Sequence, residues 1–183
     1  MRITPHGAAR QVTGSMYQLV LDSGYTILVD CGLNYEPEFR RENNALFPFD
    51  PSEIDVVLLT HAHLDHSGNL PTLYRKGFQG KVLCTEPTFV LCELLLSDSA
   101  TLEAKRVQKA YKRKNREAGA GRLYGHGDVR DVTENMVTLP FNKPFELTSD
   151  VTHTFIPAGH ILGAASIVLD IREGGRTKRV VFS

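Results

Sequence analysis

Four side chains of metal-ligand type lie within six consecutive positions of the stretch THAHLDHSG, residues 60–68. His61 and His63 are two positions apart, so at the end of a strand both imidazoles project to the same side and can reach one cation. Zinc accepts imidazole nitrogen and carboxylate oxygen and is usually held by about four ligands. The stretch therefore predicts metal chemistry, with these two histidines as part of one ion's ligand set.

The other two side chains of the stretch, Asp65 and His66, lie in the turn before the next predicted helix and could face a second cation. Two metal ions roughly 3.5–4 Å apart can share and deprotonate a water and hold the oxygen of an ester under attack. Burying three imidazoles and a carboxylate without a metal would leave several polar groups to satisfy, so chance is the weaker interpretation. A lone histidine is usually a surface or hydrogen-bonded residue, the interpretation we keep for His6, His126 and His153.

Two more positions fit the same site. His160 lies in PAGHILGAAS, residues 157–166, where Gly159 and Gly163 permit tight turns and close backbone approach, so a third imidazole could arrive from a distant part of the chain. Asp30 ends the apolar strand of LVDCG, where an unpaired carboxylate would be costly. We expect it to orient a ligand or a loop through hydrogen bonds, with a turn cap at the strand end as the alternative.

Short strands and a few helices must position these side chains. One predicted strand ends where the histidine cluster begins, and the Ser23-Gly24 pair predicts a hairpin before it. Helices after the cluster, one of them capped by Asp128, separate the first strands from a strand-rich end, which is typical of a layered α/β domain. The predicted strands are 15–22, 25–32, 54–60, 81–84, PFEL, VTHTFIPA, ASIVLDI and KRVVFS; the predicted helices are 67–77, about 88–118 and 128–136. The inward stripe predicted for the long helix comprises Leu91, Leu94, Leu95, Leu102, Val107 and Tyr111.

The composition is that of an ordinary globular protein. A chain of 183 residues, 42% hydrophobic and 23% charged, fits one domain with a real core. Its 21 basic side chains equal its 21 acidic ones, so net charge provides no general attraction to nucleic acid or to a membrane. Cys31, Cys84 and Cys92 lack CxxC spacing, and no signal segment or membrane span is evident. A cytoplasmic location without disulfides is the expectation.

The segment EAKRVQKAYKRKNREAGAGR, residues 103–122, is locally basic. A cationic helix could contact a phosphate backbone in a salt-dependent way. The basic residues spread around the predicted helix, however, and no aromatic platform for stacked bases accompanies them. We therefore interpret this charge as a solvated helix surface.

The sequence resembles the metallo-β-lactamase superfamily in three motifs that occur in the same order. THAHLDHSG matches the HxHxDH signature, LVDCG the earlier aspartate motif and AGHILGA the later histidine motif. Within the superfamily, GAARQVTGS and AGHILGAAS resemble the β-CASP nucleases, relatives of the endonuclease subunit of the pre-mRNA cleavage and polyadenylation machinery. The interval between His66 and His160 contains the long helix and YGHGDVRDV, as in β-CASP proteins, whereas glyoxalase-type members have a shorter interval.

This resemblance implies an αββα sandwich and a zinc-dependent enzyme that hydrolyses RNA phosphodiester bonds with a metal-bound hydroxide. It also implies two zinc ions in the complete protein. Carried over residue by residue, the family pattern makes His61, His63 and His160 the ligands of one zinc, Asp65 and His66 ligands of the other, and Asp65 and Asp30 the residues with catalytic roles.

The departure from the family pattern is at the end of the chain. Family members follow the strand matching KRVVFS with a Gly-Asp motif whose aspartate bridges both metals, then with a β-CASP domain and a final histidine ligand. The chain stops at Ser183, so we expect residues 1–183 to be the N-terminal part of a metallo-β-lactamase domain, incomplete at the C-terminus and without the β-CASP domain. We expect weak metal affinity and no activity alone, with RNA and either a second copy or the missing C-terminal part as partners.

Two other functional classes stay open. The chain could be a non-catalytic metal-binding or interaction module of the same fold, which would cleave no RNA even with the missing part restored. It could also be a hydrolase of small-molecule esters or thioesters. A comparison of RNA with such esters as substrates separates the two enzyme hypotheses.

Overall fold

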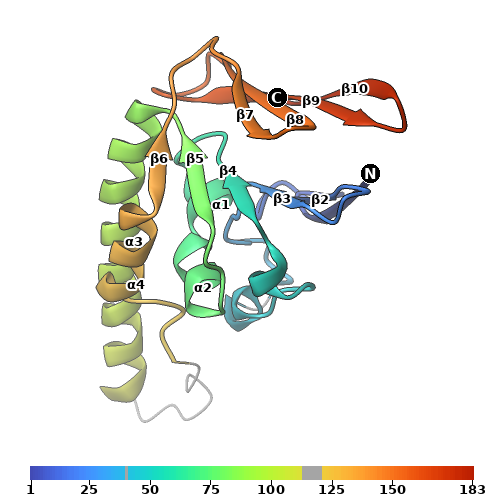
Figure 1. The fold of residues 1–183 in the computed structure, drawn as a ribbon. Coiled ribbons are helices and arrows are strands. Elements are labelled where there is room, and N and C mark those ends of the chain that lie inside the picture. The colour runs from blue at the N-terminus through green and yellow to red at the C-terminus, as the bar shows by residue number, and fades with distance from the viewer. Residues whose placement is uncertain (40, 113–120) are drawn as a thin grey trace.

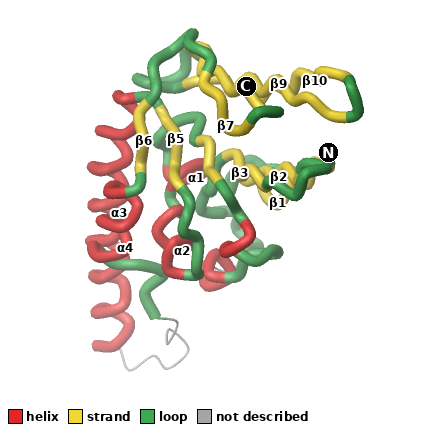
Figure 2. Tube along the Cα trace, in the orientation of Figure 1, coloured by secondary structure: helices red, strands yellow, loops and turns green. Residues whose placement is uncertain are grey.

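Two β-sheets and a layer of helices make up the fold (Figure 1), and the computed structural model describes residues 1–39, 41–112 and 121–183. The six-stranded sheet consists of β1 (Arg2–Gly7), β2 (Met16–Val20), β3 (Thr26–Val29), β4 (Val56–Leu58), β5 (Lys81–Cys84) and β6 (Met136–Thr138). The four-stranded sheet consists of β7 (Phe145–Thr148), β8 (Val151–Pro157), β9 (Ala165–Glu173) and β10 (Arg176–Phe182). The helices are η1 (Arg41–Ala45), η2 (Pro51–Glu53), α1 (Leu64–Ser67), α2 (Leu70–Arg75), α3 (Glu86–Lys112) and α4 (His126–Glu134). Figure 2 shows α1 to α4 on one side of the six-stranded sheet and the second sheet on its other side, which confirms the predicted layered α/β architecture.

The six-stranded sheet is antiparallel at one end and parallel at the other. Strands β1, β2 and β3 pair antiparallel, whereas β3, β4, β5 and β6 pair parallel in that order. Parallel neighbours need crossover connections, and α1 and α2 supply one between β4 and β5, while α3 and α4 supply the next. The carboxyl ends of β3, β4 and β5 therefore meet along one edge of the sheet, where the loops that follow them can share a site.

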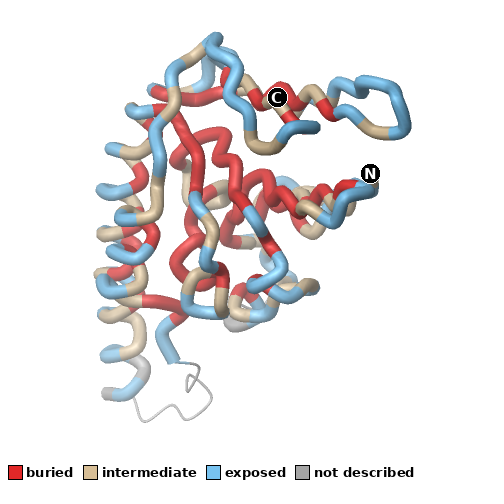
Figure 3. The backbone as a smooth tube through the Cα atoms, in the orientation of Figure 1, coloured by how far each residue is buried: buried red, intermediate tan, exposed pale blue. Residues whose placement is uncertain are grey.

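Successive side chains of the central strands point to opposite faces of the sheet, so the core has two layers. In β4, Val56 and Leu58 face the second sheet, and Val57 between them faces the helices. The second sheet is antiparallel throughout and contributes Phe155 and Ile167 to the core between the sheets. Figure 3 shows the resulting buried path through the central strands and the exposed turn between β9 and β10.

Helix α3 confirms the predicted long helix over Glu86–Lys112, and the predicted continuation at 113–118, with Gly119, lies outside the described residues. The predicted inward stripe is wrong for three of its members, because Leu94, Leu102 and Tyr111 are 66%, 55% and 87% exposed. The row that faces the sheet is instead Cys92, Leu96 and Ala100. These positions are four apart, and the small side chains among them let α3 approach closely. Within the described ranges, none of the helices has both the length and the apolar character needed to cross a bilayer.

Two strands, β1 and β6, were not among the predicted elements. Both are edge strands, and three of the six residues in β1 and two of the three in β6 are exposed, so neither carries a strong apolar alternation. The helix predicted at 67–77 is confirmed as α2, with Gly77 at a left-handed φ of 112° just beyond its end. Asp65 and His66 were predicted in a turn, but they lie in the short helix α1. Helix α4 begins two residues before Asp128, whose carboxylate accepts the backbone N–H of Gly125 at 2.7 Å from inside the first turn.

Candidate metal centre

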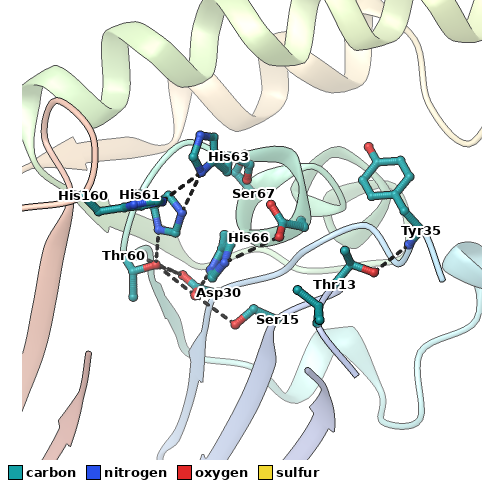
Figure 4. A network of polar contacts seen from close by, with 12 residues as sticks. Thr13, Ser15, Asp30, Tyr35, Thr60, His61, His63, His66, Ser67 and His160 are labelled. Carbon is teal, nitrogen blue, oxygen red and sulfur yellow. Dashed lines mark hydrogen bonds and ion pairs between the residues drawn. The ribbon is translucent and has the colours of Figure 1, made fainter. Parts of the chain in front are cut away.

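The candidate site lies where the strands β3 and β4 end. Asp30 directly follows β3, and Thr60 and His61 follow β4 after one more residue. The backbone N–H of Asp30 donates to the carbonyl of Leu58 at 3.0 Å, so the two loops leave the sheet side by side. Figure 4 shows the polar side chains of these loops directed toward one another. The parallel strands thus bring together Asp30 and the first histidine of the cluster, 31 positions apart in the sequence.

Three imidazole nitrogens converge at this site. Nδ1 of His63 lies 3.2 Å from Nε2 of His61 and 3.2 Å from Nε2 of His160, and one ring nitrogen from each histidine lies within 4.8 Å of the other two. Tetrahedral coordination with metal–nitrogen bonds of about 2.0–2.1 Å would separate ligand nitrogens by roughly 3.3 Å. The two shortest separations therefore fit a single divalent ion, and the structure places His160 beside the pair as the sequence predicted.

His61 is held in one tautomer by a chain of hydrogen bonds. Oγ1 of Thr60 lies 2.9 Å from Nδ1 of His61 and 2.9 Å from each carboxylate oxygen of Asp30. The carboxylate can only accept, so the single hydroxyl hydrogen of Thr60 goes to Asp30 and the hydroxyl oxygen accepts the N–H at Nδ1 of His61. Nε2 of His61 is left without a hydrogen and faces the other two imidazoles, as a metal ligand requires.

The electrostatic surroundings favour the neutral form of His61. Burial, together with the neighbouring imidazole of His66, lowers the pKa of His61 to about 4, although the carboxylate of Asp30 acts in the opposite direction. The ring is therefore neutral at physiological pH. Because a metal ion binds only neutral imidazole, no proton has to be removed from His61 before binding.

Asp30 is the centre of the hydrogen-bond network. Its side chain is 3% exposed, and its carboxylate accepts from the backbone N–H of Thr60 at 2.8 Å, from Oγ of Ser15 at 3.1 Å and from Nδ1 of His66 at 2.7 Å. Its backbone has a left-handed φ of 59°, a conformation that aspartate adopts more readily than most residues. The groups that donate hydrogen bonds to this carboxylate therefore come from other segments of the site and not from the turn that contains Asp30.

Asp65 and His66 lie beside the three histidines as a pair. Nδ1 of His66 donates to Asp30, and its Nε2 lies 3.8 Å from an oxygen of Asp65. Burial lowers the pKa of His66, but the hydrogen bond to Asp30 and the charges of both carboxylates outweigh burial, so the pKa is raised. Among the residues that the structure describes, only the three histidines form a group of at least three convergent metal ligands. Asp65 and His66, which the sequence predicts as ligands of a second ion, thus lie side by side, and their role as ligands stays a prediction.

A cavity of about 570 Å³ opens beside these residues, between the two sheets. Its polar wall includes Asp30, His61, His66 and His160, and its apolar wall includes residues of β2, β3, β9 and β10. The exposure of the histidines increases from His61, which is buried, through His63 to His160, which is exposed. A ligand could reach the convergent nitrogens from the side of His160.

Two residues of the network were not predicted to have a role. Thr60 and Ser15 both occur in the motifs quoted from the sequence, but their link to Asp30 depends on contacts between separate loops. Of the isolated histidines, His6 contacts Gln18 at 3.0 Å and His126 contacts Thr101 at 3.3 Å, as expected for hydrogen-bonded residues. His153 contradicts that expectation: it is 1% exposed, and neither ring nitrogen has a hydrogen-bond partner among the described residues. Its place between Val151 and Phe155 in an alternating strand is the sequence signal that predicts an inward position.

Comparisons with known proteins agree with this site. A profile described as the metallo-beta-lactamase superfamily matches residues 10–164. Ribonuclease TTHA0252 of Thermus thermophilus is 37% identical over 100% of this chain, which spans 37% of that protein. Transcription termination factor FttA of Methanosarcina mazei is 32% identical over 100% of this chain, which spans 27% of that protein. The chain thus covers about a third of the length of these curated relatives.

Solved structures resemble the fold with lower sequence identity. BJP-1, a subclass B3 metallo-β-lactamase of Bradyrhizobium japonicum, has a TM-score of 0.53 and 19% identity, with 94% of this chain and 56% of that chain covered. A metallo-β-lactamase of Cronobacter sakazakii has a TM-score of 0.53 and 21% identity, with 94% and 53% covered. This likeness concerns the fold alone, and it confirms the predicted metallo-β-lactamase-type sandwich.

Proposed function

The chain belongs to the metallo-β-lactamase superfamily, and we propose that it is a zinc-dependent hydrolase of RNA phosphodiester bonds, within the β-CASP group. The observation that carries the proposal is the convergence of three imidazole nitrogens, with separations of 3.2 Å, beside Asp65 and His66. RNA is favoured as substrate because the relatives at 37% and 32% identity are named as a ribonuclease and a transcription termination factor. The lactamases share only the fold at about 20% identity.

The residues of the site suit zinc. His61, His63 and His160 would hold one ion, and Asp65 and His66 would contribute to the site of a second. Imidazole nitrogen with carboxylate oxygen is a donor set typical of zinc in hydrolases. When bound, zinc lowers the pKa of a coordinated water toward neutrality and polarises a phosphoryl oxygen.

The two carboxylates have different surroundings and therefore different proposed roles. The side chain of Asp30 is 3% exposed and accepts hydrogen bonds from three residues, so it orients His66 directly and His61 through Thr60. The side chain of Asp65 is 29% exposed, and one of its oxygens lies 3.8 Å from Nε2 of His66. Asp65 is placed to hold or move a proton during hydrolysis, whereas Asp30 is placed to keep the rings in position.

We place residues 1–183 in the N-terminal part of a longer nuclease, because the chain covers about a third of its curated relatives. The RNA-binding cleft would then be completed by a C-terminal part with a β-CASP domain or by a second copy of the chain. The interpretation of the basic segment 103–122 as a solvated helix surface, rather than an RNA contact, stays a prediction, since part of that segment lies outside the described residues. A cytoplasmic location stays a prediction as well.

The test uses the whole protein that contains this chain, purified with and without zinc, on end-labelled RNA and on a small thioester. We expect zinc-dependent cleavage of the RNA and loss of cleavage when Asp65 is replaced by Asn. His126→Ala is the matched control, because His126 is exposed and contacts Thr101 away from the site. Hydrolysis of the thioester without RNA cleavage would favour the small-molecule hydrolase, and a zinc-loaded protein that cleaves neither substrate would favour the non-catalytic module.

A further inference from the structure

The loop that carries His160 brings this histidine to the site from a distant part of the chain. His160 is exposed, whereas His61 is buried at the end of a strand, and 97 positions separate His160 from its neighbour His63. Residues 158–164 form this loop between β8 and β9. Because the loop lies at the open side of the site, the position of the His160 ring depends on how firmly the loop backbone is held.

The base of the loop is closed by backbone hydrogen bonds. The N–H of Ala158 donates to the carbonyl of Ala164 at 3.0 Å, and the N–H of Ala165 donates to the carbonyl of Thr60 at 2.9 Å. The second bond ties the start of β9 to the residue before His61. A third bond, from the N–H of Ala164 to the carbonyl of Ile161 at 3.0 Å, closes the turn after His160, but it joins the loop to itself and not to another element.

Two threonine hydroxyls hold the backbone of this loop from another element. Oγ1 of Thr85 donates to the carbonyl of Gly163 at 2.6 Å, and Oγ1 of Thr88 donates to the same carbonyl at 3.0 Å. Thr85 and Thr88 are 1% and 0% exposed and lie at the start of α3, directly after β5. A carbonyl oxygen has two lone pairs, and these two donors can fill both.

The contact between the loop and the helix leaves no room for a side chain at Gly163. A Cβ atom there would lie 2.5 Å from the backbone nitrogen of Thr88 and 2.9 Å from Oγ1 of Thr85. Gly163 also has a left-handed φ of 81°, which favours glycine. The loop backbone therefore packs directly against the first turn of α3, and the loop conformation that presents His160 depends on this contact.

We propose that Thr85 and Thr88 are positioning residues for His160, through a hydroxyl clamp formed by their two Oγ1 atoms on the carbonyl of Gly163. The inference rests on the proposed metal site. The two hydroxyls are not equivalent, because Thr85 also accepts the N–H of Thr88 at 3.4 Å and so caps the helix. Within the described part of the chain, the hydroxyl of Thr88 makes no bond to the helix backbone, and it lies 3.0 Å from the hydroxyl of Thr85. Thr88 can therefore be changed while the bond that caps the helix, from the N–H of residue 88 to Thr85, is kept.

The test measures metal binding to the purified protein, by zinc competition and by the visible absorption of bound cobalt(II), which reports ligand geometry. Thr88→Val should weaken zinc binding about tenfold, the lower end of the effect of residues that orient ligands, and should change the cobalt spectrum. Thr88→Ser restores the hydroxyl and should restore both signals. The matched control is Thr72→Val, because Thr72 is a helical threonine, 1% exposed, whose hydroxyl has no hydrogen-bond partner among the described residues.

A Thr88→Val protein that is folded and has the zinc affinity and cobalt spectrum of the natural protein would overturn the clamp. Thr88→Ala repeats the test with a better helix-forming residue if valine does not fit. Failure of the natural protein to bind zinc or cobalt would instead overturn the proposed metal site. Loss of binding in Thr88→Val with retention in Thr72→Val and Thr88→Ser would support the clamp.

Discussion

Two buried histidines of this chain, His61 and His153, have similar acidities and different surroundings. They are 7% and 1% exposed, and the pKa of each is lowered to about 4, with burial as the main cause. His61 donates from one ring nitrogen toward Thr60 and directs the other toward His63. His153 lies against the ring of Phe155, with centroids 4.6 Å apart, in the core between the two sheets.

The comparison shows that a lowered pKa does not by itself identify a metal ligand. Burial penalises the charged imidazole in both places. What distinguishes His61 is that one ring nitrogen is fixed by a hydrogen-bond chain to Asp30, so the other is free and aimed at a shared point. His153 has neither feature among the described residues.

The largest effect should come from removing two of the three convergent imidazoles. His61→Ala combined with His63→Ala leaves only His160 of the three, so zinc affinity should fall by more than about 100-fold, beyond the effect of orienting residues. Metal content after dialysis, measured by mass spectrometry, checks this. His153→Leu is the control, because it removes a buried histidine outside the site, and this variant should retain its zinc. Equal zinc content in the double variant and the natural protein would remove the basis for the assignment.

The next largest effect concerns acid stability, and it belongs to His153. Its folded-state pKa of about 4 lies below the ordinary 6.5, so as the pH falls the unfolded chain takes up the proton first. The contribution of neutral His153 to the free energy of unfolding is therefore present in full above about pH 6.5. It is lost progressively as the pH falls toward 4, by a total of about 3 kcal/mol. Urea unfolding of the metal-free natural protein and of His153→Leu, compared over this range, should show a shallower loss in the variant. If stability falls with pH equally in the natural protein and in His153→Leu, the pKa of His153 is the same in the folded and the unfolded chain.

Much of this fold was predictable because its central strands carry local signals. The runs that form β3, β4 and β5 are short and apolar, so their ends and the loops that follow could be placed from the sequence. The edge strands β1 and β6 could not, because exposed strands lack that pattern. The face of α3 was misjudged because its buried row combines Cys92 and Ala100 with Leu96, while larger leucines are exposed.

The candidate site was predictable where its geometry is local. The two-residue spacing of His61 and His63 reflects their shared side, and the glycines around His160 reflect the tight turn of its loop. The links from Asp30 to Ser15 and from Thr85 to Gly163 join segments that meet only in the folded chain. Pairings of this kind depend on tertiary packing, and a single sequence carries no signal for them.

A smaller effect should follow when the carboxylate that orients both rings becomes an amide. Asp30→Asn keeps the shape of the side chain, but an NH₂ group that replaces the oxygen facing His66 would oppose the N–H at Nδ1 of that ring. The His66 ring should then move its hydrogen to Nε2, the nitrogen that faces Asp65. We expect zinc affinity to fall about 10- to 100-fold, the range found for residues that orient metal ligands.

Nitrogen-15 NMR of the histidine rings distinguishes this tautomer change from general damage to the fold. The His66 signals should exchange their protonated and unprotonated positions in Asp30→Asn, whereas those of His153 should stay where they are. An unchanged His66 tautomer together with unchanged zinc affinity would show that the network can adapt to the amide, and Asp30 would lose its proposed role.

The smallest effect should come from the hydroxyl between Asp30 and His61. Thr60→Val preserves the branched shape and the backbone N–H that donates to Asp30, but it removes the oxygen that accepts from Nδ1 of His61. The His61 ring would then lose the bond that fixes its tautomer, and zinc affinity should fall about tenfold. Thr60→Ser is the matched control, since it retains the hydroxyl and loses only a methyl group. If the Thr60→Val and Thr60→Ser proteins bind zinc equally well, burial alone orients His61. The contrast between His61 and His153 would then rest on the converging ring nitrogens and not on the hydrogen-bond chain.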